Sequence, residues 1–161
     1  MQFKPAPFAC VFTLLMPLLP YAQGPAQTAK AATAVSSLSS PVGCWKTVDD
    51  ITGKVKSLVA IREVKGKLYG KIEKVYDPPV PNPLCIECTG SLKDRPVVGL
   101  QVLWGLHKVD DHWTGGHILD PESGNIYRCT VALEDGGKEL RVRGYVGISL
   151  LGRTQHWLRV R

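Results

Sequence analysis

The chain has 161 residues and a formal net charge of +6, a length that suits one folded domain. Its basic residues are spread along the chain, and only Arg141, Arg143, Arg153, Arg159 and Arg161 lie close together in the sequence. A nucleic-acid binder typically concentrates basic residues in a stripe with interleaved aromatic side chains. We therefore expect no nucleic-acid partner.

The first 22 residues have the pattern of a secretory signal peptide. Lys4 supplies a positive charge, residues 8–19 form an apolar run too short to span a membrane, and Ala22 is a small residue at a cleavage position. Ala29-Lys30-Ala31 is a second candidate, so the cleavage site stays open. We expect residues 1–22 to be removed and the protein to be periplasmic or secreted.

Residues 23–41 are predicted to be a disordered tether, because they are rich in Ala, Thr, Ser and Gln and lack apolar periodicity. The folded domain is then residues 42–161. No later run approaches the length of a membrane-spanning helix, so we expect no membrane span.

Within this domain, short segments rich in alternating, β-branched or aromatic residues are separated by turn residues such as Gly, Pro and Asp. The pair Lys65-Gly66 between two such segments is a strong hairpin signal. Eight strands are predicted, over residues 43–48, 55–64, 67–76, 96–105, 112–119, 125–133, 138–146 and 154–161.

Short turns between strands favour antiparallel neighbours, and eight antiparallel strands suit an up-and-down barrel or a sandwich. We favour the barrel because it leaves no bare sheet edge. A membrane barrel would need an apolar outer face, whereas Lys71 and Glu73 share one face of their strand. Two stretches interrupt the series: a proline-rich loop at 77–95, and residues 147–153, predicted to be a helical turn or bent strand that plugs one end.

Several ordered segments carry a family resemblance. They are Gly43-Cys44-Trp45, residues 66–72, Cys85-Ile86-Glu87-Cys88, and residues 93–100, 113–121, 124–127 and 143–155. Together they resemble the exported bacterial family called domain of unknown function 2147. The resemblance implies a periplasmic or secreted barrel like those of lipocalins and fatty-acid-binding proteins, with no settled activity.

The start of the domain also resembles that of lipocalins, which open with Gly-x-Trp and place an Arg from the end of the chain over that Trp. Gly43 and Trp45 match the first part, and Arg159 or Arg153 would supply the second. A guanidinium over an indole contributes about 0.5–2 kcal/mol and would close one end of the barrel.

Four cysteines remain once the signal peptide is set aside, and an even number in an exported chain points to disulfides. Three pairings are open, and we favour Cys44–Cys129 with Cys85–Cys88. A thioredoxin-like redox motif would start a helix after a strand, whereas Cys85 follows Pro-Asn-Pro-Leu. A zinc site would have to recruit two isolated cysteines from distant strands.

The histidines do not form an obvious metal site. His112 and His117 lie five residues apart on one predicted strand and are expected on opposite faces. His107 could approach His117 across a hairpin, but no third ligand is evident. We expect isolated surface histidines, His156 included, and no metal.

No nucleophile motif, phosphate loop or cofactor motif stands out, so we expect a binding protein rather than an enzyme. The leading hypothesis is a barrel that holds a small amphipathic or anionic molecule. The alternative is an envelope module that contacts another protein through residues 77–95. The candidate ligand-binding residues are Trp104, Trp113, Tyr127, Arg143, Tyr145 and Arg153.

Overall fold

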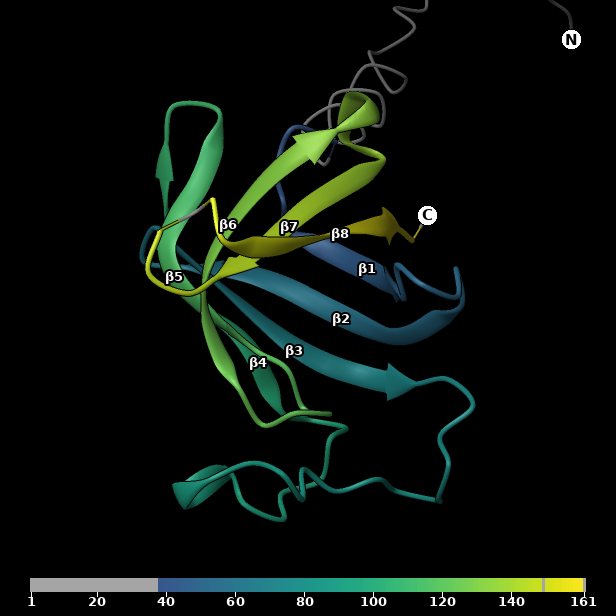
Figure 1. Ribbon diagram of the computed structural model, residues 1–161. Coiled ribbons are helices and arrows are strands. Elements are labelled where there is room, and N and C mark those ends of the chain that lie inside the picture. Colours follow the sequence, from purple (N-terminus) through teal and green to yellow (C-terminus); the bar gives the residue numbers. More distant parts are fainter. Residues whose placement is uncertain (1–37, 149, 161) are drawn as a thin grey trace, which may run out of the picture.

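The computed structural model describes residues 38–148 and 150–160, and it confirms an all-β fold (Figure 1). Eight antiparallel strands follow one another around a closed up-and-down barrel. Residues 1–37, which hold the predicted signal peptide and most of the tether, lie outside the described part. The elements are β1 Gly43–Val48, β2 Val55–Val64, β3 Lys67–Val75, η1 Gly90–Leu92, β4 Gln101–Val109, β5 His112–Leu119, β6 Ile126–Glu134, η2 Asp135–Gly137, β7 Glu139–Tyr145 and β8 Gly152–Arg159.

Along the strands, buried and exposed side chains alternate, so that they lie on opposite sides of the barrel wall. On β3, Leu68 and Ile72 are buried while Lys71 and Glu73 are exposed. Side chains two apart on a strand share a face, and so do cross-strand partners. On this strand the inner face is therefore apolar and the outer face polar. The buried side chains on the inner side include Trp45, Val59, Ile61, Leu68, Ile72, Leu103, Leu106, Trp113, Cys129, Val131, Leu140, Val142 and Trp157.

The fourth strand begins later than predicted, at Gln101 instead of residue 96. The residues before it pair with the preceding loop: the Val97 amide donates to the Pro83 carbonyl at 2.9 Å, and the Cys85 amide donates to the Arg95 carbonyl at 2.8 Å. The apolar side chains of residues 96–100 therefore belong to a loop. Alternation in the sequence does not distinguish such a loop segment from a strand.

The long connection between β3 and β4 is anchored in its middle by buried residues. Cys85 and Cys88 form a disulfide, and both half-cystines are buried in the same apolar cluster as the barrel. Gly124 in the β5–β6 turn has φ +71°, and a Cβ there would lie 2.0 Å from the Glu87 carbonyl oxygen. The loop and the turn therefore fit together only because this position is glycine.

The connection between β7 and β8 does not plug the barrel, in contrast to the prediction for residues 147–153. Val146, Ile148, Leu150 and Leu151 are 67%, 63%, 82% and 69% exposed. An aliphatic side chain that filled one end of the barrel would be buried, so this segment points away from the interior.

Arg159 closes the barrel at the end where β1 meets β8. Its guanidinium carbon lies 4.1 Å from the centre of the Trp45 ring, the contact predicted from Gly-x-Trp. It also donates hydrogen bonds to the carbonyls of Gly137 at 2.6 Å, Val42 at 3.0 Å and Ser40 at 2.6 Å. The Trp45 indole nitrogen donates to the Pro41 carbonyl at 2.8 Å. One side chain thus holds two separate backbone segments, through three carbonyls, and the indole.

Replacing Arg159 with Lys should lower the free energy of unfolding by about 2 kcal/mol, because an ammonium cannot reach three carbonyls and stack on the ring together. Urea unfolding followed by tryptophan fluorescence measures this change. Arg62→Lys, on an exposed position of β2, is the matched control and should change stability by less than about 0.5 kcal/mol. Equal effects of the two substitutions would contradict the role of Arg159.

Candidate functional site

The two ends of the barrel differ in how they are built. The closed end carries the short turns β2–β3, β4–β5 and β6–β7, together with Arg159 and residues 38–42. The other end, which we call the mouth, carries the connections over residues 49–54, 76–100, 120–125 and 146–151. Lumen-facing residues therefore meet different surroundings at the two ends.

Polar side chains on the inner wall gather toward the mouth. Thr47 follows Trp45 by two residues and its hydroxyl lies 2.8 Å from that of Ser57. Gln155 accepts a hydrogen bond from the Trp157 indole at 3.1 Å. Other polar side chains lie on the same inner side, because they pair with inner-wall residues of the neighbouring strands. We call this set the mouth cluster: Thr47, Ser57, Tyr127, Arg153 and Gln155.

Burial changes along the same wall. Toward the closed end Trp45, Leu68, Leu106 and Leu140 are fully buried. Thr47, Ser57, Tyr127 and Gln155 are only half-buried, and Arg153 is exposed. The barrel's own side chains fill the half near the closed end, whereas solvent reaches the half near the mouth.

Two ion pairs lie at the mouth. Arg153 donates to both carboxylate oxygens of Asp50 in the β1–β2 connection, with 2.8 Å between Nε and Oδ2. Lys56 on β2 contacts Glu122 in the β5–β6 turn at 2.8 Å. The hydrogen bond from Arg153 lowers the pKa of Asp50, and the one to Glu122 raises the pKa of Lys56. Both pairs are largely exposed, so they orient side chains more than they stabilise the fold.

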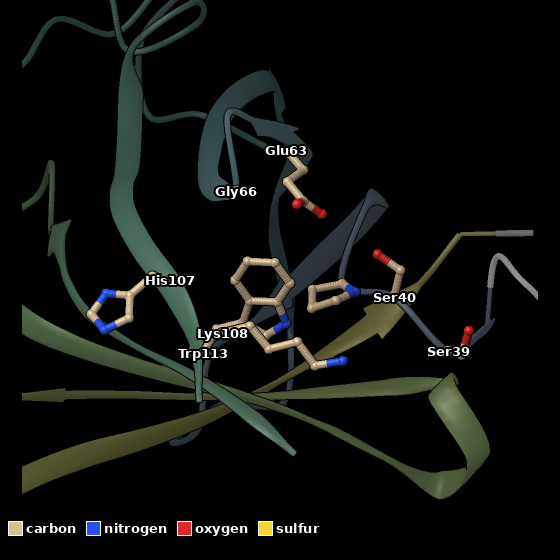
Figure 2. A pocket seen from close by; sticks show the side chains of 8 residues that line it. Ser39, Ser40, Glu63, Gly66, His107, Lys108 and Trp113 are labelled. Atoms are coloured by element: carbon tan, nitrogen blue, oxygen red, sulfur yellow. The ribbon is translucent and has the colours of Figure 1, made fainter. Parts of the chain in front are cut away.

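A groove of about 490 Å³ lies at the closed end (Figure 2). The Trp113 indole sits at its centre beside the Lys108 side chain, and Glu63 lies across from them. Small-molecule sites are mostly apolar and enclosed. This groove is open and about half of its wall is polar, so it lacks the enclosed apolar character of such a site. Its lining residues are Ser39, Ser40, Pro41, Glu63, Gly66, His107, Lys108 and Trp113.

The structure divides the predicted ligand-binding residues between the two sides of the wall. Trp113, Tyr127 and Arg153 face the lumen, although Trp113 lies near the closed end. Trp104 stacks on His117 outside the barrel with ring centres 5.7 Å apart. Two others also lie outside: Arg143 donates to Thr154 at 2.8 Å, and Tyr145 is paired with exposed Arg128.

Sequence reasoning did not identify Thr47, Ser57, Gln155 or Asp50. Thr47 and Gln155 each lie two residues from a tryptophan of the inner wall, which is a usable signal. Asp50 gave no signal, because its contact with Arg153 spans 103 residues of sequence.

The predicted Cys44–Cys129 disulfide is wrong, since both thiols are free. Cys44 precedes inward-facing Trp45 and so is exposed on the outer side, whereas Cys129 is buried inside. The wall of the barrel separates them. The predicted Cys85–Cys88 disulfide is present.

The expectation that His112 and His117 lie on opposite faces is also wrong. The pairing of β5 with β6 shifts between Trp113 and Gly116, so one extra residue reverses the alternation. Both histidines lie on the outer side, next to Ala132 and Arg128 respectively.

An up-and-down barrel of eight strands, with Gly-x-Trp on the first strand and an arginine of the last strand on that indole, defines a lipocalin-like protein. A structure from the human pathogen Helicobacter pylori, described as belonging to the lipocalin family, is similar, with a TM-score of 0.65 and 24% identity. The match covers 74% of this chain and 82% of that one, and at this identity it shows the fold alone.

The chain belongs to the family described as "Uncharacterized protein conserved in bacteria (DUF2147)", which matches residues 43–159. No curated protein matches it. Among the described residues, no helix is long and apolar enough to cross a membrane.

We expect the three classes of cysteine to react differently in protein lacking residues 1–22. Burial raises the pKa of the Cys129 thiol to about 12, so it stays protonated and shielded. Iodoacetamide should alkylate Cys44 in native protein, Cys129 only after unfolding, and Cys85 and Cys88 only after reduction. Peptide mass spectrometry measures this order, and a peptide linking Cys44 to Cys129 would contradict it.

The Arg153–Asp50 pair should be visible by NMR titration of the Asp50 carboxyl carbon. Its pKa should lie below the ordinary value in wild type and return toward that value in Arg153→Gln. A lowered carboxyl pKa stabilises the fold above the ordinary pKa, and this contribution is lost as pH falls through the folded-state value. Asp49, whose pKa is lowered chiefly by the Thr52 amide and only weakly affected by the charge of Arg153, is the internal control and should shift much less than Asp50.

Proposed function

We propose that this protein binds a small amphipathic molecule with an anionic head group in the mouth half of its barrel. The observation that carries the proposal is the change along the inner wall, from fully buried apolar side chains to half-buried polar ones. Binding sites for small molecules combine an apolar surface with a few placed polar groups. Proteins of lipocalin fold are mostly binding proteins, which supports binding over catalysis.

The apolar part of such a ligand would lie against the wall where β5, β6 and β7 meet. Gly144 faces inward there, and a Cβ on it would be 3.4 Å from Ile118 Cγ2 and 3.5 Å from Tyr127 Cβ. The missing side chain leaves space for about one methyl-sized group beside an isoleucine and an aromatic ring. Tyr127 then supplies an apolar ring face with a polar tip.

The head group would lie beside Arg153. Asp50 accepts hydrogen bonds from Nε and one Nη of this guanidinium, which carries five N–H donors in all. The remaining donors suit a carboxylate or phosphate, the anions that arginine binds most specifically. Asp50 would hold the guanidinium in place for that contact.

We place this activity in the bacterial envelope, in the periplasm or as a secreted protein. Support comes from the signal-like pattern of residues 1–22 and from the Cys85–Cys88 disulfide, since disulfides persist in oxidising compartments.

Arg153→Gln should weaken binding of a fluorescent fatty acid by about 5- to 10-fold, or about 1–1.4 kcal/mol, and leave binding of its neutral methyl ester unchanged. Fluorescence titration of the two probes measures this difference. Arg128→Gln is the matched control, because exposed Arg128 lies on the outer side of β6, next to Tyr127 in the sequence. Equal losses for both variants, or for both probes, would contradict the role of Arg153.

A second variant tests the location independently of charge. Gly144→Val fills the space beside Ile118 and Tyr127, so both probes should lose affinity while the protein stays folded. Thr154→Val, on the outer side of the next strand, should bind both probes like wild type. Failure of wild type to bind either probe would overturn the proposal for ligands of this class.

The alternative role, contact with an envelope protein through residues 77–95, is favoured by a separate observation. Val80, Leu84 and Ile86 are about half-exposed on that loop although the disulfide between Cys85 and Cys88 anchors it. Exposed apolar side chains that gather on an ordered segment are typical of interaction surfaces. Gly144→Val separates the two roles, because it would block the lumen and leave this loop unchanged.

A further inference from the structure

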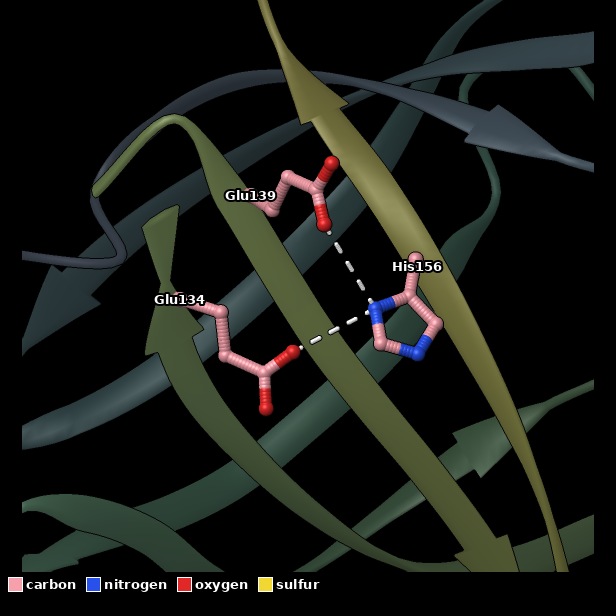
Figure 3. A group of neighbouring side chains, drawn as sticks. All are labelled: Glu134, Glu139 and His156. Atoms are coloured by element: carbon pink, nitrogen blue, oxygen red, sulfur yellow. Dashed lines mark ion pairs between the residues drawn. The ribbon is translucent and has the colours of Figure 1, made fainter. Parts of the chain in front are cut away.

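Three side chains on the outer wall converge near the closed end of the barrel (Figure 3). Glu134 is the last residue of β6, Glu139 the first of β7, and His156 lies on β8. Figure 3 shows both carboxylates directed at the imidazole from neighbouring strands. The lumen and the mouth lie on the other side of the wall, so this cluster is separate from the proposed ligand site.

The donor atoms of the cluster are spaced like the ligands of a metal ion. His156 Nδ1 lies 3.3 Å from Glu134 Oε2 and 3.7 Å from Glu139 Oε2, and all three donor atoms lie within 4.8 Å of one another. Zinc holds nitrogen and oxygen donors at about 2.0–2.2 Å, so adjacent donors of a tetrahedral site lie roughly 3.4 Å apart. A cation would need only small side-chain movements to contact all three.

The charges of the cluster also favour a cation. Glu134 and Glu139 are direct cross-strand partners, and like charges in that arrangement repel. Arg141 Nε lies 2.7 Å from Glu134 Oε1, which leaves Oε2 facing the histidine. The two glutamate carboxylates and the Arg141 guanidinium together carry one net negative charge. The contact with Arg141 is an ion pair without hydrogen-bond geometry at Nε, so it offsets part of the charge of Glu134.

We propose that Glu134, Glu139 and His156 bind a divalent transition-metal ion, with Zn²⁺ as the representative. The imidazole separates this cluster from a purely acidic one, because nitrogen with carboxylate oxygen suits Zn²⁺ and its neighbours better than Ca²⁺ or Mg²⁺. The side chains are half-buried to exposed, so water completes the coordination. Binding would join β6, β7 and β8 next to the closed end.

The test is a titration of untagged protein lacking residues 1–22 with Zn²⁺ in competition with a chromophoric chelator. Cys44→Ser serves as the background, because the exposed Cys44 thiol would itself bind zinc. We expect one saturable equivalent and a rise in the melting temperature with Zn²⁺. His156→Gln and Glu139→Gln should each weaken binding at least about tenfold, since even outer partners of metal sites cost that much.

His112→Ala is the matched control. His112 lies on the same outer wall, and its Nδ1 is 3.2 Å from the single carboxylate of Asp111. It should bind Zn²⁺ like the background protein. Far-UV circular dichroism without metal checks that every variant is folded. Absence of saturable binding in folded background protein, or equal losses in His112→Ala and His156→Gln, would overturn the proposal and leave the cluster as a set of ion pairs.

Discussion

The closure between the first and last strands is the constraint on which the rest of this structure depends. Within residues 38–148 and 150–160, β1 and β8 share two register pairs, Trp45 with Arg159 and Lys46 with Leu158. The Arg159 guanidinium compensates for this short seam by holding the indole and three carbonyls together. Without the seam the sheet would have two bare edges, which invite pairing with other chains. Burial lowers the pKa of Arg159, yet an arginine stays charged at any ordinary pH, so the contact does not depend on pH.

A closed wall also gives every strand an inside and an outside, and this division decides what each side chain can do. Arg143 and Arg153 lie on neighbouring strands, yet one contacts Thr154 outside and the other contacts Asp50 at the mouth. Cys44 and Cys129 are kept apart by the same wall. Residue type alone therefore says little about function here, and the face on which a residue lies says much more.

The two proposed sites are independent because they use opposite faces and opposite ends. The mouth cluster combines an apolar wall with an arginine held by Asp50, which suits an amphipathic anion. The outer cluster combines two carboxylates with an imidazole, which suits a metal ion. A metal on the outer wall would tie β6, β7 and β8 where the barrel is already filled, and it would leave the solvent-accessible half unchanged.

Alternation and turn residues predicted eight antiparallel strands with a polar outer wall and favoured the barrel, and the lipocalin resemblance of Gly43-x-Trp45 limited the partner of Trp45 to Arg159 or Arg153. These features are local, or depend on the single seam that closure requires. Tertiary structure alone decided that His112 and His117 share the outer face, because the bulge in β5 shifts the strand register by one residue. It also decided the pairing of Arg153 with Asp50 and the meeting of Glu134, Glu139 and His156. Contacts of that kind depend on strand register and on the closure of the barrel, so no pattern along the chain encodes them.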